Sequence, residues 1–382
     1  MTDASNGALE GIRVLDLSRV LAGPLATMYL GDLGADVIKI EPPAGDETRA
    51  WVPPVDARGV STYFTGVNRN KRGLRINLTR DEDREIVLQL AAEADVLVEN
   101  FRPGVMERFG LDYESLSAGN PGLVYCSITG FGSGAGRELA GFDLLAQAQS
   151  GLMSVTGAPD GEPMKVGVAL VDVLAGQNAV IGILSALRAR ERTRRGQRVE
   201  ISLLSAALSG LANQSSSTVV TGQSPRRHGN AHPSIAPYQM YPTADGDLVI
   251  AVGNDRQFEA LCRELGSPDL HEDPRFAANG ARVAHRAELE TVLVALLTSA
   301  SAGEWAERLT ARGVPAGTVN TIAQGLELAE KVELEPVVTI ATPEGDARSV
   351  ANPIRLSGTP VRYLLPPPDA EDHQTWNPRR EP

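Results

Sequence analysis

Short apolar segments alternate with longer amphipathic segments in the first half of the chain. The short segments have the length and composition of β-strands and lie at 12–17, 36–41, 74–78, 95–99, 123–128 and 198–203. Helices are predicted at 24–33, 81–93 and 172–192. Strands separated by helices form parallel sheets. The pattern therefore predicts an α/β fold with a doubly wound, mostly parallel sheet.

The character of the chain changes after residue 215. Residues 215–229 are polar and rich in Ser, Thr and Gly, and two strands at 238–241 and 248–252 flank the turn signal Asp245-Gly246. Helices are predicted at 255–265, 285–298 and 303–311. We expect a large domain over 1–200, a linker at 201–224 and a smaller α+β domain at 225–325. The proline-rich tail is expected to be mobile.

The loops that follow the predicted parallel strands are the first candidates for a ligand site. In doubly wound sheets, ligands bind beyond the carboxyl ends of the strands. These loops are 18–23, 100–108 and 129–142.

Charge and cysteine content narrow the function classes. The net charge of −12 argues against a nucleic-acid or anionic-membrane partner, and no apolar run is expected to reach the length of a membrane span. The polar, acidic first eleven residues do not look like a secretory signal. Cys126 and Cys262 lie far apart and form neither a disulfide framework nor a metal cluster. We therefore expect a cytoplasmic protein with no metal site.

Basic residues gather in one segment that precedes the predicted helix 81–93. The group comprises Arg69, Lys71, Arg72, Arg75 and Arg80. Both a solvated face and a phosphate-binding group fit this pattern, and the sequence leaves the choice open.

The standard catalytic motifs are absent, and the histidines are unevenly distributed. The glycine-rich run GFGSGAG at 130–136 lacks the spacing of a dinucleotide-binding loop. None of the five histidines precedes His228, so chemistry in the sheet domain depends on carboxylates, tyrosines or cysteine. Asp172 begins the long apolar helix. It fits both a helix N-cap and an ionised carboxylate nucleophile at a helix N-terminus.

Long blocks of the chain resemble the family III CoA-transferases, which include formyl-CoA and carnitine CoA-transferases. The blocks are DLSRVLAGPLATMYLGDLGADVIKIEPPAGDETR at 16–49, NRNKRGLRINL at 68–78, VENFRPGVMERFGLD at 98–112, GFDLLAQAQSGLMSVTG at 141–157, VALVDVLAGQNAVIGILSAL at 168–187 and GVPAGTVNTI at 313–322. They cover nearly the whole chain in the family's order. The loop GNAHPSIAPYQ at 229–239 looks most like that of succinyl-CoA:glutarate CoA-transferases.

The resemblance implies an enzyme that moves CoA from an acyl-CoA, such as succinyl-CoA, to a carboxylic acid, favouring a dicarboxylate such as glutarate. It places a covalent aspartyl-CoA thioester on Asp172. The implied CoA-binding residues are Leu21, Ala22, Ile76, Asn77, Leu78, Thr79, Asn100, Phe101, Arg102, Arg108, Ala140, Gly141, Phe142 and Asp143. The implied substrate loop comprises Gly229, Asn230, Ala231 and His232. Acyl-CoA is then a substrate, with no tightly bound cofactor.

The resemblance also implies an interlaced homodimer in which the C-terminal segment 326–382 returns to the large domain. Two features depart from the family pattern. Pro42 stands where some relatives carry an arginine, and AEDHQTWNPRREP replaces the usual C-terminal segment.

Two other functions remain as alternatives. A 2-methylacyl-CoA racemase of the same fold resembles the early blocks, but it carries a histidine where Phe142 stands here. A CoA-binding protein without catalysis is the second alternative, and the presence of Asp172 argues against it.

Overall fold

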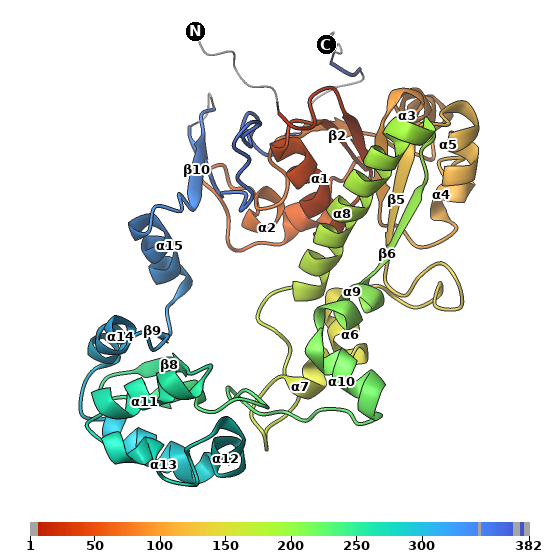
Figure 1. Cartoon of the computed structure of the whole chain (residues 1–382). Coiled ribbons are helices and arrows are strands. Elements are labelled where there is room, and N and C mark those ends of the chain that lie inside the picture. Colours follow the sequence, from red (N-terminus) through yellow and green to blue (C-terminus); the bar gives the residue numbers. More distant parts are fainter. Residues whose placement is uncertain (1–6, 343–344, 370–374, 378–382) are drawn as a thin grey trace. The chain divides into compact units, whose positions relative to one another are not determined.

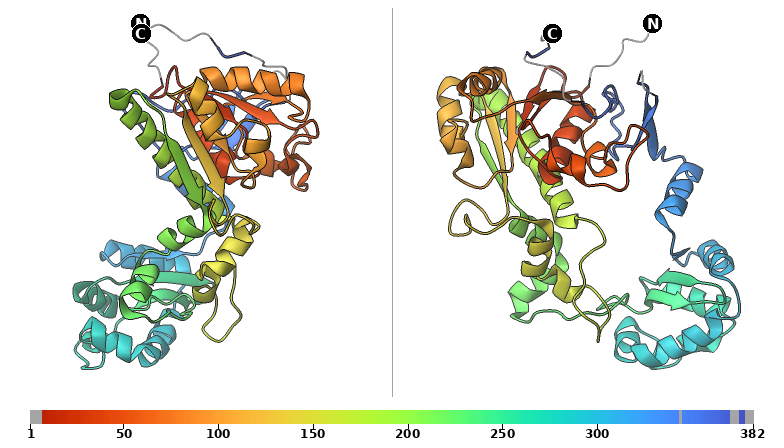
Figure 2. Two further views of the ribbon diagram at one scale, coloured as in Figure 1. Left: turned by 90° about the vertical axis from the view of Figure 1, so that its right-hand side faces the viewer. Right: turned by 180° about the vertical axis from the view of Figure 1, so that it is seen from behind.

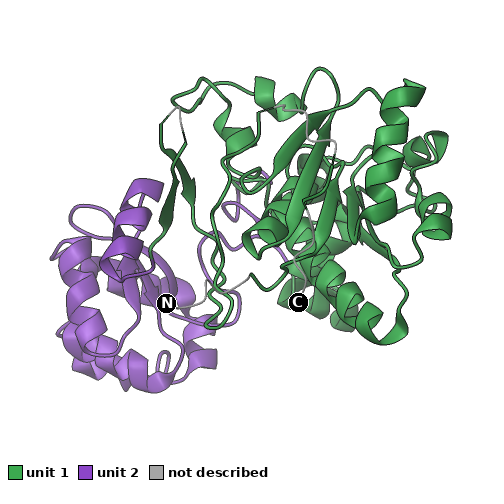
Figure 3. Ribbon diagram, turned by 90° about the horizontal axis from the view of Figure 1, so that it is seen from above, with its two compact units in different colours: residues 1–152, 165–223, 335–382 green, residues 153–164, 224–334 purple. Residues whose placement is uncertain are grey.

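The structure is a computed structural model that describes residues 7–342, 345–369 and 375–377 (Figure 1). The chain forms two compact units (Figure 3). Unit 1 consists of Met1–Leu152, Lys165–Gln223 and Glu335–Pro382. Unit 2 consists of Met153–Met164 and Ser224–Leu334. The short segment 153–164 therefore belongs with the second unit, which the sequence pattern did not indicate.

Unit 1 is built on a six-stranded sheet in which every neighbouring pair is parallel. The strands are β1 (Arg13–Asp16), β2 (Asp36–Glu41), β3 (Arg72–Arg75), β4 (Val96–Glu99), β5 (Val124–Thr129) and β6 (Arg198–Ser202). Their order is β3-β2-β1-β4-β5-β6, so the direction of winding reverses between β1 and β4. The predicted α/β class and parallel sheet are confirmed.

Alternate strand residues face opposite sides of the sheet, and each side has its own hydrophobic core. Val14 and Val96 lie in the core beneath α1 (Ala22–Asp32) and α8 (Leu170–Thr193). Leu15 and Leu97 lie in the opposite core, beneath α3 (Asp81–Glu93) and α5 (Tyr113–Gly119). Figure 2 shows these two helical layers from two further sides. Because both faces are covered, the central strands β4 and β5 are almost entirely buried.

Helix α8 lies very close to α1. This close approach is possible because Gly176 of α8 has no side chain. A Cβ atom at Gly176 would lie 2.7 Å from the carbonyl oxygen of Ala22.

By length and composition alone α8 could cross a membrane. The expectation that no apolar run is long enough is therefore wrong for this helix. Packing against α1 and the sheet accounts for its apolar composition, since Ala175, Ala179 and Ile183 belong to the core.

The predicted linker at 201–224 is wrong, because most of it is helical. It contains α9 (Leu203–Gly210) and α10 (Asn213–Thr221), and both belong to unit 1. Leu203, Ala206 and Ala207 on α9 are buried in the same core as α8. The Ser- and Thr-rich residues from 215 on, which suggested a linker, instead form part of α10, whose residues are not buried.

Unit 2 has a three-stranded antiparallel sheet with its own core. The strands are β7 (Tyr238–Pro242), β8 (Asp247–Ala251) and β9 (Ala316–Thr318), in the order β7-β8-β9. The helices are α11 (Asp255–Glu264), α12 (Asn279–Ala284), α13 (Arg286–Leu297), α14 (Ala302–Ala311) and α15 (Ile322–Lys331). The predicted hairpin and three predicted helices are confirmed within a few residues.

The C-terminal segment is held against unit 1 by buried polar contacts. Arg69 pairs with Asp32 at 2.6 Å and donates to the carbonyl oxygen of Val350 at 2.8 Å. Near the end of the chain, Trp376 is buried, and its indole N–H donates to the carbonyl oxygen of Leu90 at 3.0 Å. A mobile tail was therefore the wrong prediction for 375–377. Residues 370–374 and 378–382, to which the same prediction extended, lie outside the described residues.

The basic group at 69–80 is largely internal rather than a phosphate site. Besides the Arg69–Asp32 pair, the Lys71 ammonium lies 3.0 Å from Asp16, and Arg72 lies 2.7 Å from Asp36. These three cations compensate buried or half-buried carboxylates, so the phosphate-binding interpretation is wrong for them.

Replacing Gly176 by alanine should destabilise the protein by about 1–3 kcal/mol, because the new methyl group displaces α8 from α1. Thermal unfolding measures this loss. Gly325→Ala on α15 is the matched control, since nothing lies within 4 Å of the position that its Cβ would occupy. That variant should gain up to about 1 kcal/mol from helix propensity. Equal effects of the two changes would contradict the close contact.

Candidate active site

A cavity of about 320 Å³ opens beyond the carboxyl ends of β1, β4 and β5. Its walls come from residues 19–22, 47, 100–103, 128–132, 136–137, 139, 141–143, 172 and 203. All three loops predicted to carry the site contribute to these walls. The cavity lies where the strand order reverses, which is where doubly wound sheets bind ligands.

Nine of the residues singled out from the sequence line this one cavity. They are Leu21, Ala22, Asn100, Phe101, Arg102, Gly141, Phe142, Asp143 and Asp172. Ile76, Asn77, Leu78, Thr79, Arg108 and Ala140 do not line it. Segments that follow different strands thus meet at one cavity. Of the second group, Ala140 lies between the wall residues Leu139 and Gly141, and the other five lie elsewhere on unit 1.

The second group is engaged in local structure. Ile76 is buried in the core under α3. The Asn77 side chain accepts a hydrogen bond from the Thr79 hydroxyl at 2.7 Å, in the turn that leads into α3. Arg108 is exposed and donates to the carbonyl oxygen of Gly104 at 3.2 Å. A role for these residues in CoA binding stays a prediction.

Asp172 is the third residue of α8, not its N-cap. The N-cap is Ala169, which has no side-chain acceptor. The free amides are instead capped from another helix. Asp143, the first residue of α6 (Asp143–Gln149), accepts from the backbone N–H groups of Val171 at 2.8 Å and Asp172 at 3.2 Å. The N-cap interpretation of Asp172 is therefore wrong, and its own carboxylate is available to the cavity.

Gln147 fixes the capping carboxylate from one turn further along α6. Its side-chain amide donates to Asp143 at 2.5 Å, and its oxygen accepts from the Val166 N–H at 2.9 Å. Gln147 is itself buried. The segment before α8 and the cap of α8 are therefore tied to the same helix.

The pKa of Asp172 is raised to about 7, chiefly by burial and secondly by the negative charge of Asp143. The helix N-terminus was expected to keep Asp172 ionised, but burial and the neighbouring charge act in the opposite direction. The pKa of Tyr63 is raised to about 12 by burial and then by the charges of Asp172 and Asp143. A carboxyl group poised near neutral pH at a cavity is typical of a functional site.

The loop between β1 and α1 forms one wall in a strained conformation. Val20 has φ +67°, which costs a β-branched residue about 1–3 kcal/mol. It precedes Leu21, the N-cap of α1, which has no side-chain cap. The first amides of α1 therefore lie at the wall that Leu21 and Ala22 form.

Arginines line the cavity alongside its carboxylates. Arg19 lies over the Phe101 ring, with its guanidinium carbon 4.7 Å from the ring centroid. Arg102 and Arg137 also line the cavity and can bind phosphate groups. The sequence interpretation missed Arg19, Arg137 and Glu47 as wall residues. The first two lie in loops that it did single out.

The predicted substrate loop lies in unit 2. Gly229 has φ +59°, and a Cβ there would approach Pro159 of the segment 153–164 to 3.3 Å. Arg227 donates to the carbonyl oxygen of Gly161 at 2.7 Å, which ties the same segment to the loop. His232 Nδ1 accepts from the Ser234 N–H at 3.1 Å, so Nε2 carries the proton in a neutral ring.

A reversed-order parallel sheet, a helix N-terminus and arginines around a half-buried carboxylate are features suited to an enzyme that acts on a phosphate-containing substrate. Comparison with known proteins identifies the enzyme class. Residues 9–374 match the family model "CoA-transferase family III". The chain belongs to this family and is a CoA-transferase.

Similar proteins agree with this assignment. The succinate–glutarate CoA-transferase of Agrobacterium fabrum is 44% identical, covering 98% of this chain and 96% of that protein. The acetyl-CoA:oxalate CoA-transferase of Acetobacter aceti is 40% identical, covering 92% and 90%. The crystal structure of a CAIB/BAIF family protein from Brucella suis has a TM-score of 0.87 and 43% identity, covering 97% and 98%.

Proposed function

We propose that the protein transfers CoA from an acyl-CoA to a free dicarboxylate, with Asp172 as the covalent nucleophile. The observation that carries this proposal is the position of Asp172. It is a half-buried carboxyl group with a pKa of about 7, and it lines a cavity with arginines and the N-terminus of α1. The family resemblance assigns the nucleophile to the same residue.

The reaction needs only carboxylates and a thiolate as nucleophiles. The Asp172 carboxylate attacks the thioester carbonyl of the donor, the C–S bond breaks, and a mixed anhydride and CoA thiolate form. The thiolate then attacks the aspartyl carbonyl of the anhydride, which gives an aspartyl-CoA thioester and releases the donor acid. The acceptor carboxylate reverses both steps, forming its own anhydride with Asp172 and finally its own CoA thioester.

The residues around Asp172 have separate tasks in this scheme. Asp143 holds the first turn of α8 and so fixes the direction of the Asp172 side chain. Arg19, Arg102 and Arg137 are suited to the phosphates of CoA. Because the intermediates hydrolyse readily, water must be excluded from the cavity, and the family resemblance assigns this task to the loop at Gly229.

The substrate class is inferred from relatives and from the loop. Two similar enzymes are named for diacids, glutarate and oxalate. His232 can donate a hydrogen bond to the distal carboxylate of such an acid through Nε2. We therefore place succinyl-CoA as a donor and glutarate or a related diacid as the acceptor.

We further propose that the working form is the interlaced homodimer of the family. Unit 1 carries apolar side chains that a monomer would leave in water. Val219 and Val220 on α10 are 85% and 80% exposed, and Phe142 is 63% exposed. Adjacent exposed apolar residues such as Val219 and Val220 are expected at a protein interface.

Asp172→Ala should abolish CoA transfer while leaving thermal unfolding nearly unchanged, because it removes the nucleophile and no hydrogen bond of the cap. Mass spectrometry of the wild type treated with acyl-CoA and hydroxylamine should find Asp172 modified. The variant should show no modification at this position. Transfer that survives in the alanine variant would disprove the assignment.

The transfer rate should fall about tenfold per pH unit below pH 7, because Asp172 reacts as a carboxylate and is protonated there. Asp143→Asn keeps a capping oxygen but removes the negative charge, so the pKa of Asp172 falls and the acidic limb moves to lower pH. The shift should be partial, since burial is the larger cause. Glu47→Gln, in the same cavity, is the control whose profile should keep the wild-type position.

His232→Ala should reduce kcat/KM for glutarate at least about tenfold more than for a monoacid of similar length, since only the diacid loses a charged hydrogen bond. The KM for acyl-CoA should stay nearly unchanged. His228→Ala in the preceding turn is the matched control. An unchanged preference between the two acids would show that His232 does not bind the distal carboxylate.

A further inference from the structure

The strained conformation of Val20 is held by bonds to the residue that precedes it. Asn100, which follows β4, binds both sides of the Arg19 residue. Its side-chain oxygen accepts from the Arg19 N–H at 2.8 Å, and its amide donates to the Arg19 carbonyl oxygen at 2.8 Å. Since a side-chain amide that makes both bonds fixes the orientation of the loop, Asn100 acts on the cavity through Arg19.

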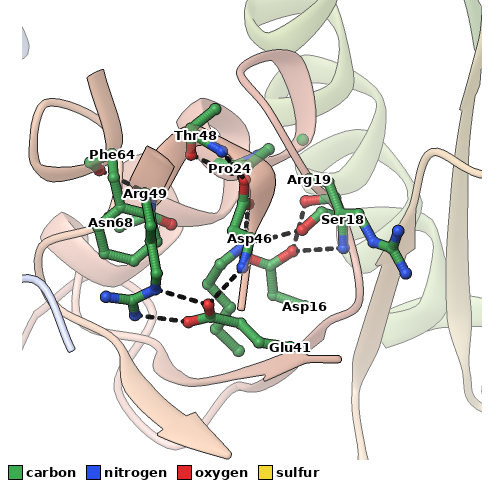
Figure 4. Close-up of polar contacts among 12 residues, drawn as sticks. Asp16, Ser18, Arg19, Pro24, Glu41, Asp46, Thr48, Arg49, Phe64 and Asn68 are labelled. Carbon is green, nitrogen blue, oxygen red and sulfur yellow. Dashed lines mark hydrogen bonds and ion pairs between the residues drawn. The ribbon is translucent and has the colours of Figure 1, made fainter. Parts of the chain in front are cut away.

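Ser18 is fixed in the same way from the opposite side. Its backbone N–H donates to Asp16 at 2.9 Å, and its hydroxyl donates to the same carboxylate oxygen. Its carbonyl oxygen accepts from the Lys39 ammonium at 2.8 Å. The bonds of Asp16 to Ser18 are drawn in Figure 4. Every polar backbone atom of residues 18 and 19 therefore has a side-chain partner.

The groups that hold Ser18 belong to a fully buried cluster of charges. Lys39 lies 3.1 Å from Asp46, and Lys71 lies 3.0 Å from Asp16, with all four side chains inaccessible to solvent. Although burial raises the pKa of Asp16, Lys71 and Lys39 together lower it to about 2, so Asp16 is ionised at neutral pH.

The cluster extends to the first turn of α1. Lys71 also donates to the carbonyl oxygen of Pro24 at 2.9 Å, and Thr27 donates to Asp16 at 2.7 Å. Gly23 completes the arrangement, because a Cβ at this position would overlap the Ser18 side chain at 2.3 Å. The cluster therefore fixes both the loop and the helix that begins after it.

A buried cluster of four charges is poorly explained by stability. Apolar side chains of similar volume usually stabilise a core as well as a buried ion pair does. Two of the charges bind backbone atoms of Ser18, which an apolar residue cannot do. The geometry thus favours a role in positioning.

We propose that Lys39, Asp16 and Asn100 are positioning residues for CoA transfer. They hold residues 18 and 19 from both sides, and so keep Val20 left-handed and Leu21 and Ala22 at the cavity wall. None of the three reacts with substrate in this role. The proposal rests on the proposed function only for its effect on transfer, since the order of the loop can be measured separately.

The double variant Lys39→Met with Asp46→Asn tests this proposal. It removes one buried cation and one buried anion together, so no uncompensated charge remains, and the side-chain oxygen of the new asparagine can still accept from Thr48. Trypsin can cut after Arg19, which makes the rate of cleavage a direct measure of loop order. We expect cleavage at Arg19 about tenfold faster than in wild type, which corresponds to about 1.4 kcal/mol. We also expect kcat/KM for transfer to fall about tenfold.

Arg72→Met with Asp36→Asn is the matched control. These residues form an ion pair between β2, the strand that also carries Lys39, and β3, at the amino ends of both strands. Cleavage at Arg19 and transfer should both stay at wild-type values in this variant. Thermal unfolding of both double variants separates a local change in the loop from a general loss of stability.

Asn100→Ala is the second route to the same result, because it frees Arg19 without touching a buried charge. If the Lys39 double variant does not fold, the same two changes are expected in Asn100→Ala. Wild-type cleavage at Arg19 in a folded variant would overturn the proposal, and so would faster cleavage with unchanged transfer. CoA transfer that survives Asp172→Ala would instead disprove Asp172 as the nucleophile. It would not affect the interpretation of the cleavage rate at Arg19.

Discussion

The close approach of α8 to α1 at Gly176 is the contact on which the site depends. It places the first turn of α8 beside the first turn of α1, since Gly176 follows Asp172 by four residues and lies on the same helix face. One helix supplies the carboxylate, and the other supplies its N-terminal amides, which no N-cap side chain binds. A larger residue at 176 would separate the two helix ends, so a packing constraint in the core determines the geometry of the cavity.

Charge is used in opposite ways on the two sides of this contact. Asp16 is surrounded by ammonium groups, and its pKa is lowered to about 2. At Asp172, by contrast, burial and the negative charge of Asp143 both raise the pKa, which reaches about 7. A compensated carboxylate is an inert structural acceptor, whereas an uncompensated one stays reactive. The difference separates the residue that positions the loop from the residue proposed to react.

The sequence predicted the parallel sheet, the helices and the loops of the cavity because their signals are local. Apolar runs define strands, and loops after parallel strands converge without further information. The capping of α8 by Asp143 could not be predicted, since it joins residues 143 and 171 through tertiary packing. For the same reason Lys71 was open to a phosphate-binding interpretation, because its partner Asp16 lies 55 residues away.

The errors at 201–224 and at the tail have a common physical cause. Polar residues from 215 on were interpreted as a linker, but 213–221 forms α10, and Ala206 and Ala207 on the preceding helix α9 are buried in the core of unit 1. At the tail, Trp376 packs in the core under α3, and its neighbour Asn377 donates a hydrogen bond to Asp36 on β2. These two contacts hold residues 376 and 377 against unit 1. Asp36 is thereby shared between Arg72 and the end of the chain. The sheet edge at β2 and β3 is thus completed by residues from the far end of the sequence, which local patterns do not reveal.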